Sequence, residues 1–333
     1  MKKIIITGGN GFIGCNLVKK ALKKGFNVVN IDALTYASNK LNNIEFSNYQ
    51  NYTFFQEDIL NEEKIYKIVS SEKPDYIMHL AAETHVDNSI SSPLKFIETN
   101  IKGTYNLLEA SRKYLKEYNP NNFIFHHIST DEVFGALGKK GFFTEESPYS
   151  PRSPYSASKA ASDHLVNAWH YTYNLPTLIT NCSNNYGPFQ HSEKLIPLVI
   201  TNILMKKEIP VYGDGTNVRD WLHVHDHVDA LFEVLEKGTI GESYNIGSEN
   251  EIKNIELVHK ICEIMQNLNN VTQDCKQLIK FVEDRPGHDE RYAICPKKIN
   301  NQIKWKSKIN FDEGLKNTIN WYVNNEEWWF TQS

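Results

Sequence analysis

Short apolar runs alternate with longer amphipathic stretches up to about residue 182. The runs are KKIIIT, NVVNID, TFFQED, DYIMHL, NFIFHHIS and PTLITNC. Runs of this length between breaker residues are typical of buried parallel strands. Helix-like segments separate them near residues 12–24, 61–71, 93–117 and 155–173. This alternation predicts an α/β protein built on a doubly wound parallel sheet.

After about residue 184 the pattern loosens. Polar loops with glycine and proline now join the helices: NNYGPFQHSEK, YGDGTNVRD and EDRPGHDERY. We therefore expect a second, smaller lobe that is partly interleaved with the first. The sheet-based lobe is assigned residues 1–183 and about 213–247, and the smaller lobe about 184–212 and 248–333.

Composition narrows the class of protein. The chain has 333 residues and a formal net charge of −4, which is too mild for a nucleic-acid surface or a polybasic membrane contact. Its five scattered cysteines contain no Cys-x-x-Cys, so we expect a reducing cytoplasm and no zinc site. The first apolar run breaks after Ile6, too early for a signal peptide. No segment approaches the ~20 apolar residues of a membrane span.

The first strand runs into a glycine-rich turn, TGGNGFIG. Gly9, Gly11 and Gly14 match the G-x-G-x-x-G dinucleotide fingerprint, and Gly8 precedes them. Such a turn lets the backbone approach a pyrophosphate at a helix N-terminus. Asp32 ends the second strand, where a carboxylate grips the ribose hydroxyls and repels a 2′-phosphate. The pattern predicts NAD rather than NADP; the alternative is a purely structural glycine turn.

A tyrosine and a lysine are spaced for one helix face in SPYSASK. Ser153 can cap a helix and Pro154 suits its first position. Tyr155 and Lys159 are then four residues apart on one face. An ammonium near a phenol favours the phenolate, so Tyr155 could take a proton from an alcohol. The alternative is an ordinary surface pair.

Two adjacent acids follow the apolar run NFIFHHIS. Its last residue, Ser129, is followed by Thr130, Asp131 and Glu132. Neighbouring side chains on a strand point to opposite faces. We therefore expect the strand to end at about Thr130 and the acids to lie in the turn beyond it, at the carboxyl edge of the sheet. Crowding two carboxylates should raise the pKa of one. The alternative is a simple Thr-Asp helix cap.

Taken together, these motifs resemble the extended short-chain dehydrogenase/reductase family, and within it the NAD-dependent nucleotide-sugar epimerases and dehydratases. The resemblance covers nearly the whole chain. Small departures are Thr84 in THVD, Phe134 in place of tyrosine, and a short loop after Gly135. The matching stretches are TGGNGFIG, MHLAAETHVDNSI, FIETNIKGTYNLLEA, HHISTDEVFG, SPYSASKAASDHLV, TNCSNNYGP, EKLIPLVI, RDWLHVHDH, YNIG and DRPGHDERY.

The resemblance implies a lyase that dehydrates a nucleotide sugar at C4–C6. It implies that Tyr155 and Lys159 act in oxidation of C4 while Thr130 bonds the C4 oxygen. It further implies that Glu132 removes the C5 proton and Asp131 protonates the leaving C6 hydroxyl. The hydride then returns to C6, so the expected product is a 4-keto-6-deoxy sugar. Only the overall resemblance favours thymidine over uridine or cytidine.

The resemblance also implies the binding residues and the assembly. A homodimer is expected, through the helices near 93–117 and 155–173. The NAD site is expected to contain Gly8, Gly11, Phe12, Ile13, Gly14, Asp32, Ala33, Leu34, Thr35, Asp58, Ile59, Leu80, Ala81, Ala82, Thr99, Tyr155, Lys159 and Asn185. The nucleotide sugar is expected to contact Thr84, Thr130, Asn184, Lys194, Leu195, Pro210, Val211, Tyr212, Arg219, Asn254, Asp284, Arg285, Pro286, Gly287 and His288. Arginine forks at Arg219 and Arg285 suit diphosphate oxygens.

Other interpretations stay open. A UDP-hexose 4-epimerase is one alternative, but its reaction does not require Asp131 and Glu132. A dehydratase for another nucleotide sugar is a second alternative, and its reaction does require both acids. A catalytically dead NAD-binding sensor is the non-enzyme alternative. The HVHDH stretch places His223, His225 and His227 two residues apart, as on one strand face, but no metal is expected there; Asp226 is interpreted as a helix cap. His126 and His127 are expected to pack within the sheet.

Overall fold

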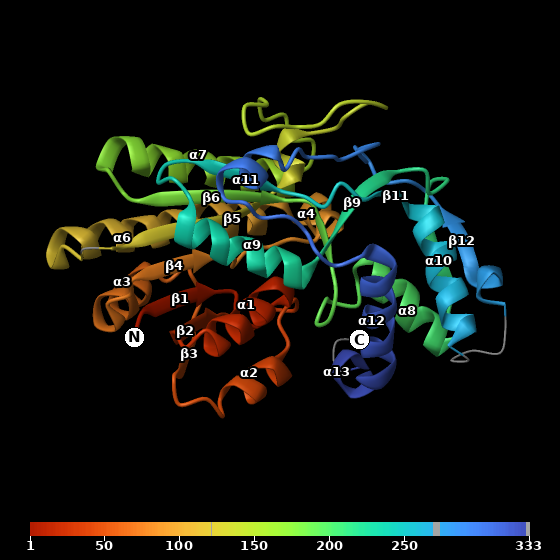
Figure 1. Ribbon diagram of the computed structural model, residues 1–333, viewed down its shortest axis with the longest axis horizontal. Coiled ribbons are helices and arrows are strands. Elements are labelled where there is room, and N and C mark those ends of the chain that lie inside the picture. Colours follow the sequence, from red (N-terminus) through yellow and green to blue (C-terminus); the bar gives the residue numbers. More distant parts are fainter. Residues whose placement is uncertain (121, 269–273, 331–333) are drawn as a thin grey trace.

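The computed structural model describes residues 1–120, 122–268 and 274–330. Its centre is a seven-stranded sheet in the order β10-β6-β5-β4-β1-β2-β3, in which each pair of neighbours is parallel (Figure 1). This confirms the predicted doubly wound sheet. The strands are β1 (Lys3–Thr7), β2 (Asn27–Asp32), β3 (Tyr52–Gln56), β4 (Tyr76–His79), β5 (Ile124–Thr130), β6 (Thr177–Cys182) and β10 (Ser243–Ile246).

Helices cover both faces of this sheet. Ile4 and Ile6 of β1 pack in one core cluster with residues of α1 and α9, whereas Ile5 packs in another with residues of α3, α6 and α7. Successive strand residues point to opposite faces, so one apolar run supplies both cores. The helices are α1 (Phe12–Lys23) and α9 (Val224–Lys237) on one face, and α3 (Glu62–Glu72), α6 (Thr104–Tyr118) and α7 (Pro154–Tyr173) on the other (Figure 1).

The single helix predicted over 93–117 is interrupted. A short α5 (Pro93–Phe96) leads into a π-helical segment, η1 (Ile97–Gly103), before α6 begins. The wide turn holds Asn100 inward, where its side chain donates to Glu83 O at 3.0 Å and to Ser158 Oγ at 2.8 Å. π-Helical turns often occur at functional sites. Two further helices, α2 (Lys40–Phe46) and α4 (Val86–Ser91), have no counterpart in the prediction.

A second group of elements forms its own core, at the right of Figure 1. Buried Ile200, Leu257 and Leu315 from three of its helices share one cluster. The strands are β7 (Asn184–Tyr186), β9 (Val218–His223) and β11 (Glu251–Lys253) in one sheet, and β8 (Ile209–Tyr212) and β12 (Ile279–Val282) in another. The helices are α8 (Leu195–Met205), α10 (Asn254–Asn267), α12 (Phe311–Asn324) and α13 (Glu326–Phe330), with 3₁₀ segment η3 (Cys275–Leu278).

Two features bear on the predicted lobes. The strand β9, assigned to the sheet-based lobe, pairs with β7 and β11 instead. The helix α11 (Lys297–Gln302), assigned to the smaller lobe, places Ile299 in the core cluster of the large sheet. The division into lobes stays a prediction, and residues 121, 269–273 and 331–333 of it lie outside the described residues.

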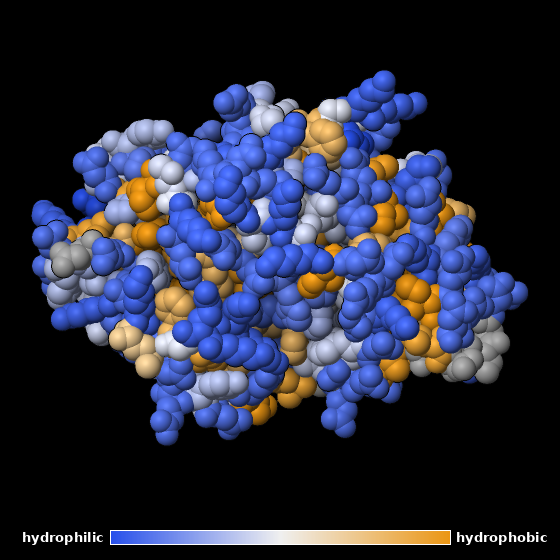
Figure 2. Space-filling model, in the orientation of Figure 1, coloured by the Kyte–Doolittle hydropathy of each residue, from blue (hydrophilic) through white to orange (hydrophobic). Residues whose placement is uncertain are grey.

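Hydrophilic residues cover most of the face shown in Figure 2. Within the described ranges, none of the helices is long and apolar enough to cross a membrane.

Candidate active site

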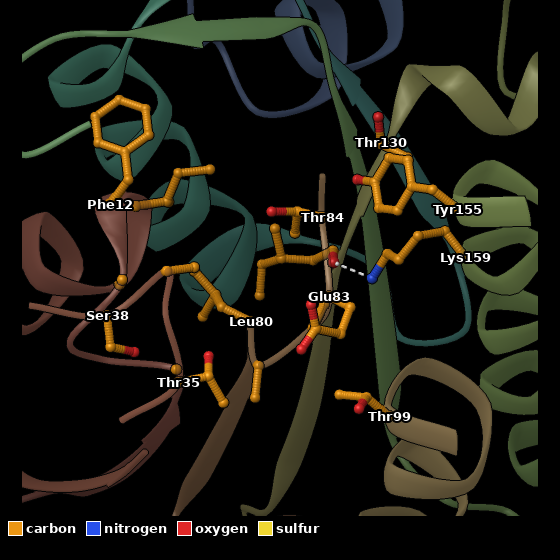
Figure 3. Close-up of a pocket in the computed structure, with 18 of the residues that line it drawn as sticks. Phe12, Thr35, Ser38, Leu80, Glu83, Thr84, Thr99, Thr130, Tyr155 and Lys159 are labelled. Atoms are coloured by element: carbon orange, nitrogen blue, oxygen red, sulfur yellow. Dashed lines mark hydrogen bonds between the residues drawn. The ribbon is translucent and has the colours of Figure 1, made fainter. Parts of the chain in front are cut away.

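A cavity of about 460 Å³ opens beyond the carboxyl ends of β1, β4, β5 and β6. Figure 3 shows Phe12 and Ser38 on one side of it and Tyr155 and Lys159 on the other. Every residue predicted for the NAD site lines this cavity except Leu34. Because strand ends meet at one edge of a parallel sheet, segments far apart in the chain converge here.

The glycine turn shapes one wall of the cavity. Gly8 has a left-handed φ of 74° and donates its N–H to Ile31 O at 2.8 Å. A Cβ on Gly14 would lie 2.0 Å from Gly8 O, so no larger residue fits there without a backbone shift. The helix α1 begins at Phe12 without a side-chain cap, so its first N–H groups remain available to an anion.

Asp32 lies at the end of β2, beside this turn. Its carboxylate accepts hydrogen bonds from Asn10 N at 2.9 Å, Leu34 N at 2.8 Å and Ser38 Oγ at 2.7 Å. Burial raises the pKa of Asp32, and these hydrogen bonds oppose the rise. Leu34 orients the carboxylate through its backbone N–H and does not line the cavity, and its contact with the cofactor stays a prediction.

The two adjacent acids lie where the sequence predicted. The strand β5 ends at Thr130, and Asp131 and Glu132 begin the 3₁₀ turn η2 (Asp131–Phe134). Thr130 Oγ1 accepts a hydrogen bond from Glu132 N at 3.3 Å and donates one to Asp131 Oδ1 at 3.3 Å. All three side chains line the cavity.

The pKa values of the acids diverge from their usual range. Burial raises the pKa of Asp131 well above its usual value, and the charge of Glu132 raises it further. Burial also raises the pKa of Glu132, but the positive charges of Arg219, Lys194 and Arg285 oppose the rise. Crowding was expected to be the cause; desolvation is the larger effect.

Tyr155 and Lys159 lie on the first turns of α7, as predicted. Ser153 caps the helix in a reciprocal capping box with Ser156, and Pro154 follows at the first position. The ammonium of Lys159 donates to Ile128 O at 2.9 Å (Figure 3).

The electrostatics of Tyr155 differ from the expectation. Burial raises the pKa of Tyr155 well above its usual value, and the charge of Glu132 adds to this, whereas a hydrogen bond with Thr130 opposes it. In the protein alone, burial thus has a larger effect on this pKa than the lowering expected from Lys159. The positive charge of a bound cofactor would add to that of Lys159 in favouring the phenolate.

The three predicted phosphate-binding cations approach Glu132 from different elements. Lys194 precedes α8 and donates to Thr84 O at 3.1 Å. Arg219 lies on β9 with its guanidinium carbon 4.4 Å from the ring centroid of Tyr292. Arg285 follows β12 and pairs with Asp87 at 2.8 Å.

The predicted substrate contacts divide into two groups. Thr84, Thr130, Asn184 and Lys194 line the cavity. The others lie outside its lining, mostly on the second group of elements: Leu195, Pro210, Val211, Tyr212, Arg219, Asn254, Asp284, Arg285, Pro286, Gly287 and His288. Arg285 stacks on Tyr212, with its guanidinium carbon 4.3 Å from the ring centroid, which joins two of these segments.

Sequence reasoning missed part of the lining. The polar loop before α8 was noted only as a loop, although its Gln190, His191 and Glu193 all line the cavity. Glu83, in the loop after β4, pairs with Lys95 of α5 at 2.8 Å, a contact that no local pattern indicates. The remaining unpredicted lining residues are Ile31, Ala37, Ser38, Glu57, Leu60, Glu98, Ile128, Ser129, Cys182 and Ser183.

The histidine pattern of HVHDH is not a strand face. His223 ends β9, whereas His225 and His227 lie in α9. The interpretation of Asp226 as the helix cap was wrong: His223 Nδ1 accepts the capping bond from His225 N, and Asp226 accepts from the backbone N–H groups of residues 308 and 309. Among the described residues, no group of three His, Cys, Asp or Glu side chains is placed to hold a metal.

Comparison with known proteins gives consistent matches. The model of the GDP-mannose 4,6 dehydratase family matches residues 5–318. A dTDP-glucose 4,6-dehydratase of Escherichia coli is 51% identical, with 98% of this chain and 95% of the relative covered. The dTDP-glucose 4,6-dehydratase of Bacillus anthracis, in complex with NAD, superposes with a TM-score of 0.89 at 44% identity and full coverage of both chains. DesIV, the dTDP-glucose 4,6-dehydratase of Streptomyces venezuelae, also with NAD bound, gives 0.91 at 38% identity, covering 99% of this chain and 100% of that one.

Proposed function

This chain belongs to the dTDP-glucose 4,6-dehydratase family, and from that premise we propose that it converts dTDP-glucose to dTDP-4-keto-6-deoxyglucose. It is an NAD-dependent lyase that acts on a nucleotide sugar. The observation that carries the proposal is the turn after β5, which places two acids of raised pKa beside Tyr155 in one cavity. Removal of water needs a base and an acid in this turn, whereas interconversion of configuration at C4 needs neither of these two groups.

The cavity fits NAD on its own geometry. The turn at Gly14 has no room for a Cβ, so α1 packs closely against the turn, as the third glycine of the dinucleotide-binding motif requires. The carboxylate of Asp32 is fixed at the end of β2, where it can accept from ribose hydroxyls and repel a 2′-phosphate. Bound NAD supplies a hydride acceptor that takes hydrogen from C4 and later returns it to C6.

The chain supplies the proton transfers. Tyr155 takes the proton of the C4 hydroxyl, and Thr130 holds the C4 oxygen by a hydrogen bond. The C4 ketone makes the C5 hydrogen acidic, and Glu132 removes it. Asp131, whose pKa is raised well above its usual value, keeps a proton to give to the leaving C6 hydroxyl. Once hydride has returned to C6, C5 is reprotonated. Lys194, Arg219 and Arg285 supply the positive charge that suits a diphosphate.

The alternatives are less well supported. A 4-epimerase gives no role to Asp131 and Glu132 at the buried edge. A dead NAD-binding sensor gives no role to Tyr155 and Lys159. Another nucleotide base is disfavoured by the relatives, which are dTDP-glucose dehydratases over nearly the full length of the chain.

We propose a homodimer for the assembly. Leu94 and Ile97, in the helical segment predicted to form the contact, are 65% and 50% exposed, and Tyr171 on the neighbouring α7 is 79% exposed. Apolar side chains exposed on adjacent helices indicate an interaction surface.

Light scattering should give twice the mass of one chain, and Leu94→Lys with Ile97→Lys should give monomers, whereas Leu41→Lys on α2 should not. A monomeric unaltered chain at micromolar concentration would contradict this. Cys15, Cys182, Cys262 and Cys295 form no disulfide, which supports a reducing, cytoplasmic location.

The function is tested by incubating the protein with dTDP-glucose and no added reductant. A 4-keto-6-deoxy product is expected. Substrate deuterated at C4 should give product with deuterium on the C6 methyl group, since the hydride never reaches water. Reaction in heavy water should place deuterium at C5, because a carboxylate exchanges its proton. Solvent deuterium at C6, with the C4 label lost, would overturn the mechanism.

A further inference from the structure

Three buried polar residues follow one another at four-residue spacing along α7. Tyr155 and Lys159 belong to the site, and Asp163 lies one turn further on, with no exposed surface. Residues four apart share a helix face. The proposed proton transfers give Asp163 no role, yet a buried carboxylate is costly unless it is paired and hydrogen-bonded.

The surroundings of Asp163 keep it ionised. Its Oδ2 accepts from Ser129 Oγ at 2.8 Å, Tyr149 OH at 2.9 Å and Asn181 Nδ2 at 3.3 Å. Its Oδ1 lies 3.2 Å from His127 Nε2. Burial opposes ionisation, but the contact with His127, the charge of Lys159 and the hydrogen bond from Ser129 outweigh it and hold the pKa of Asp163 below its usual value.

His127 lies between this carboxylate and the lysine. Its Nε2 is also 3.5 Å from Lys159 Nζ, so an ammonium and a carboxylate contact the same ring nitrogen. Burial lowers the pKa of His127 to about 4, so the ring is neutral at pH 7. A neutral ring nitrogen either accepts from the ammonium or donates to the carboxylate, depending on its tautomer.

The other titratable groups around this cluster are neutral at pH 7. His79 on β4 is packed against His127, with ring centroids 5.2 Å apart, and burial lowers its pKa well below its usual value. Burial raises the pKa of Cys182 on β6 and of Tyr149 in the loop before α7. Burial lowers the pKa of Lys159. Within the described chain, the groups that oppose this lowering are Asp163 and Cys182, and of these two only Asp163 is charged.

We propose that Asp163 is a positioning residue that keeps Lys159 in its ammonium form, through its negative charge acting across His127, on the face of α7 that carries Tyr155. The inference rests on the proposed function, because it assigns Lys159 a charge that the oxidation step uses. Without the carboxylate, a buried lysine releases its proton at lower pH. An uncharged amine would no longer favour the phenolate of Tyr155.

A direct titration tests the charge without any substrate. In protein labelled with ¹⁵N at lysine Nζ, the Lys159 resonance, assigned by its loss in Lys159→Met, should report an ammonium at neutral pH. In Asp163→Asn its pKa should fall by about one unit or more. Tyr149→Phe removes one hydrogen bond to the same carboxylate and keeps its charge, so it should shift the Lys159 pKa much less. An amine at neutral pH in the unaltered chain, or an unchanged pKa in Asp163→Asn, would overturn the inference.

The kinetic test uses the oxidation step alone. Reduction of bound NAD by dTDP-glucose can be followed in Glu132→Gln protein, in which elimination is blocked and the acid Asp131 is not required. Adding Asp163→Asn should move the alkaline limb of the rate toward neutral pH by about the same one unit, while Tyr149→Phe should leave it nearly in place. An equal loss of rate at all pH values would mean a merely structural role and would overturn the inference.

Two safeguards keep the outcomes separate. If Asp163→Asn fails to fold, Asp163→Ser serves as the second uncharged variant, and an amine in the unaltered chain overturns the inference whether or not either variant folds. If dTDP-glucose does not reduce the cofactor in any protein, the proposed function fails, while the nitrogen titration still decides the charge of Lys159.

Discussion

The carboxylate of Asp32 and the backbone N–H of Asn10 are joined by a hydrogen bond of 2.9 Å. This bond ties the end of β2 to the glycine turn after β1, so the group proposed to hold the ribose and the turn proposed to hold the pyrophosphate form one unit. Ser38 and Leu34 hold the other oxygen of the same carboxylate. The position of Asp32 is thus fixed before any ligand arrives.

Replacing Asp32 should therefore change cofactor choice. In Asp32→Ala the affinity for NAD should fall by roughly 10–100-fold, the worth of hydrogen bonds to one charged group, while discrimination against NADP weakens. Ser38→Ala, which removes one bond to the carboxylate and leaves its charge, should have a smaller effect. Calorimetric titration with both nucleotides measures this, and tight binding of NADP by the unaltered protein would contradict it.

Two glycines of the same turn should separate folding from cofactor binding. In Gly14→Ala the new Cβ meets Gly8 O at 2.0 Å, so the backbone must shift and the free energy of unfolding should fall by about 1–3 kcal/mol. In Gly11→Ala the new Cβ lies 3.4 Å from its nearest neighbour, Gly8 O, and the φ of −78° suits any residue. The free energy of unfolding should therefore stay nearly unchanged while the affinity for NAD falls. Chemical denaturation and NAD titration on both variants provide the check; equal loss of stability in the two would refute the distinction.

Glu132→Gln should stop elimination and leave the oxidation step. The amide cannot remove the C5 proton, so product formation should fall by roughly 100-fold or more. Tyr155 and Lys159 remain, so bound NAD should still be reduced on addition of dTDP-glucose, as seen by its absorbance. Glu63→Gln, at an exposed position of α3, serves as the control. A variant that neither reduces NAD nor forms product would assign Glu132 to oxidation instead.

Asp131 gives a prediction for pH. Burial raises its pKa well above the usual value, so elimination should slow as the pH rises through that raised pKa. Asp131→Asn should slow the loss of water by roughly 100-fold, because an amide is a far poorer acid, and should abolish this limb of the pH profile. Product formation measured as a function of pH distinguishes the two proteins. An unchanged limb in the variant would show that another group causes it.

Buried histidines should make the fold sensitive to acid. Burial lowers the pKa of His126 and His227 to about 3 and that of His127 to about 4. In the unfolded chain a histidine has a pKa of ~6.5. The contribution of these neutral histidines to the free energy of unfolding is therefore complete above that pH and is lost as the pH falls toward the pKa values of the folded protein. At pH 5 each of these histidines should lower the free energy of unfolding by about 2 kcal/mol relative to its value above pH ~6.5. Denaturation at several pH values checks this.

A matched pair of variants isolates one of these protons. His126→Gln keeps a partner for Thr180 Oγ1, which lies 3.2 Å from His126 Nε2, but cannot titrate. It should reduce the acid dependence by about one proton, whereas Thr180→Val, which removes the same hydrogen bond and leaves His126 to titrate, should not. Identical slopes for both variants would refute the assignment.

Local patterns predicted those parts of the site that depend on local geometry. The alternation of side-chain directions along a strand predicted the end of β5 at Thr130. The capping preference of serine predicted Ser153 as the cap of α7. Both features are present. The π turn around Asn100 and the capping of α9 by His223 depend on contacts across the core, which periodicity does not contain. The same holds for the pairing of Arg285 with Asp87, which are 198 residues apart.

The turn after β5 also suggests how such an enzyme can change its chemistry over evolutionary time. The turn is closed by the backbone bond from Gly135 N to Glu132 O, which involves neither the Asp131 nor the Glu132 side chain. Substitutions there can add or remove an acid–base step while the sheet, the cofactor turn and the helix with Tyr155 stay as they are. Divergence of reaction type within one ancestral scaffold then requires very few mutations, confined to a single segment.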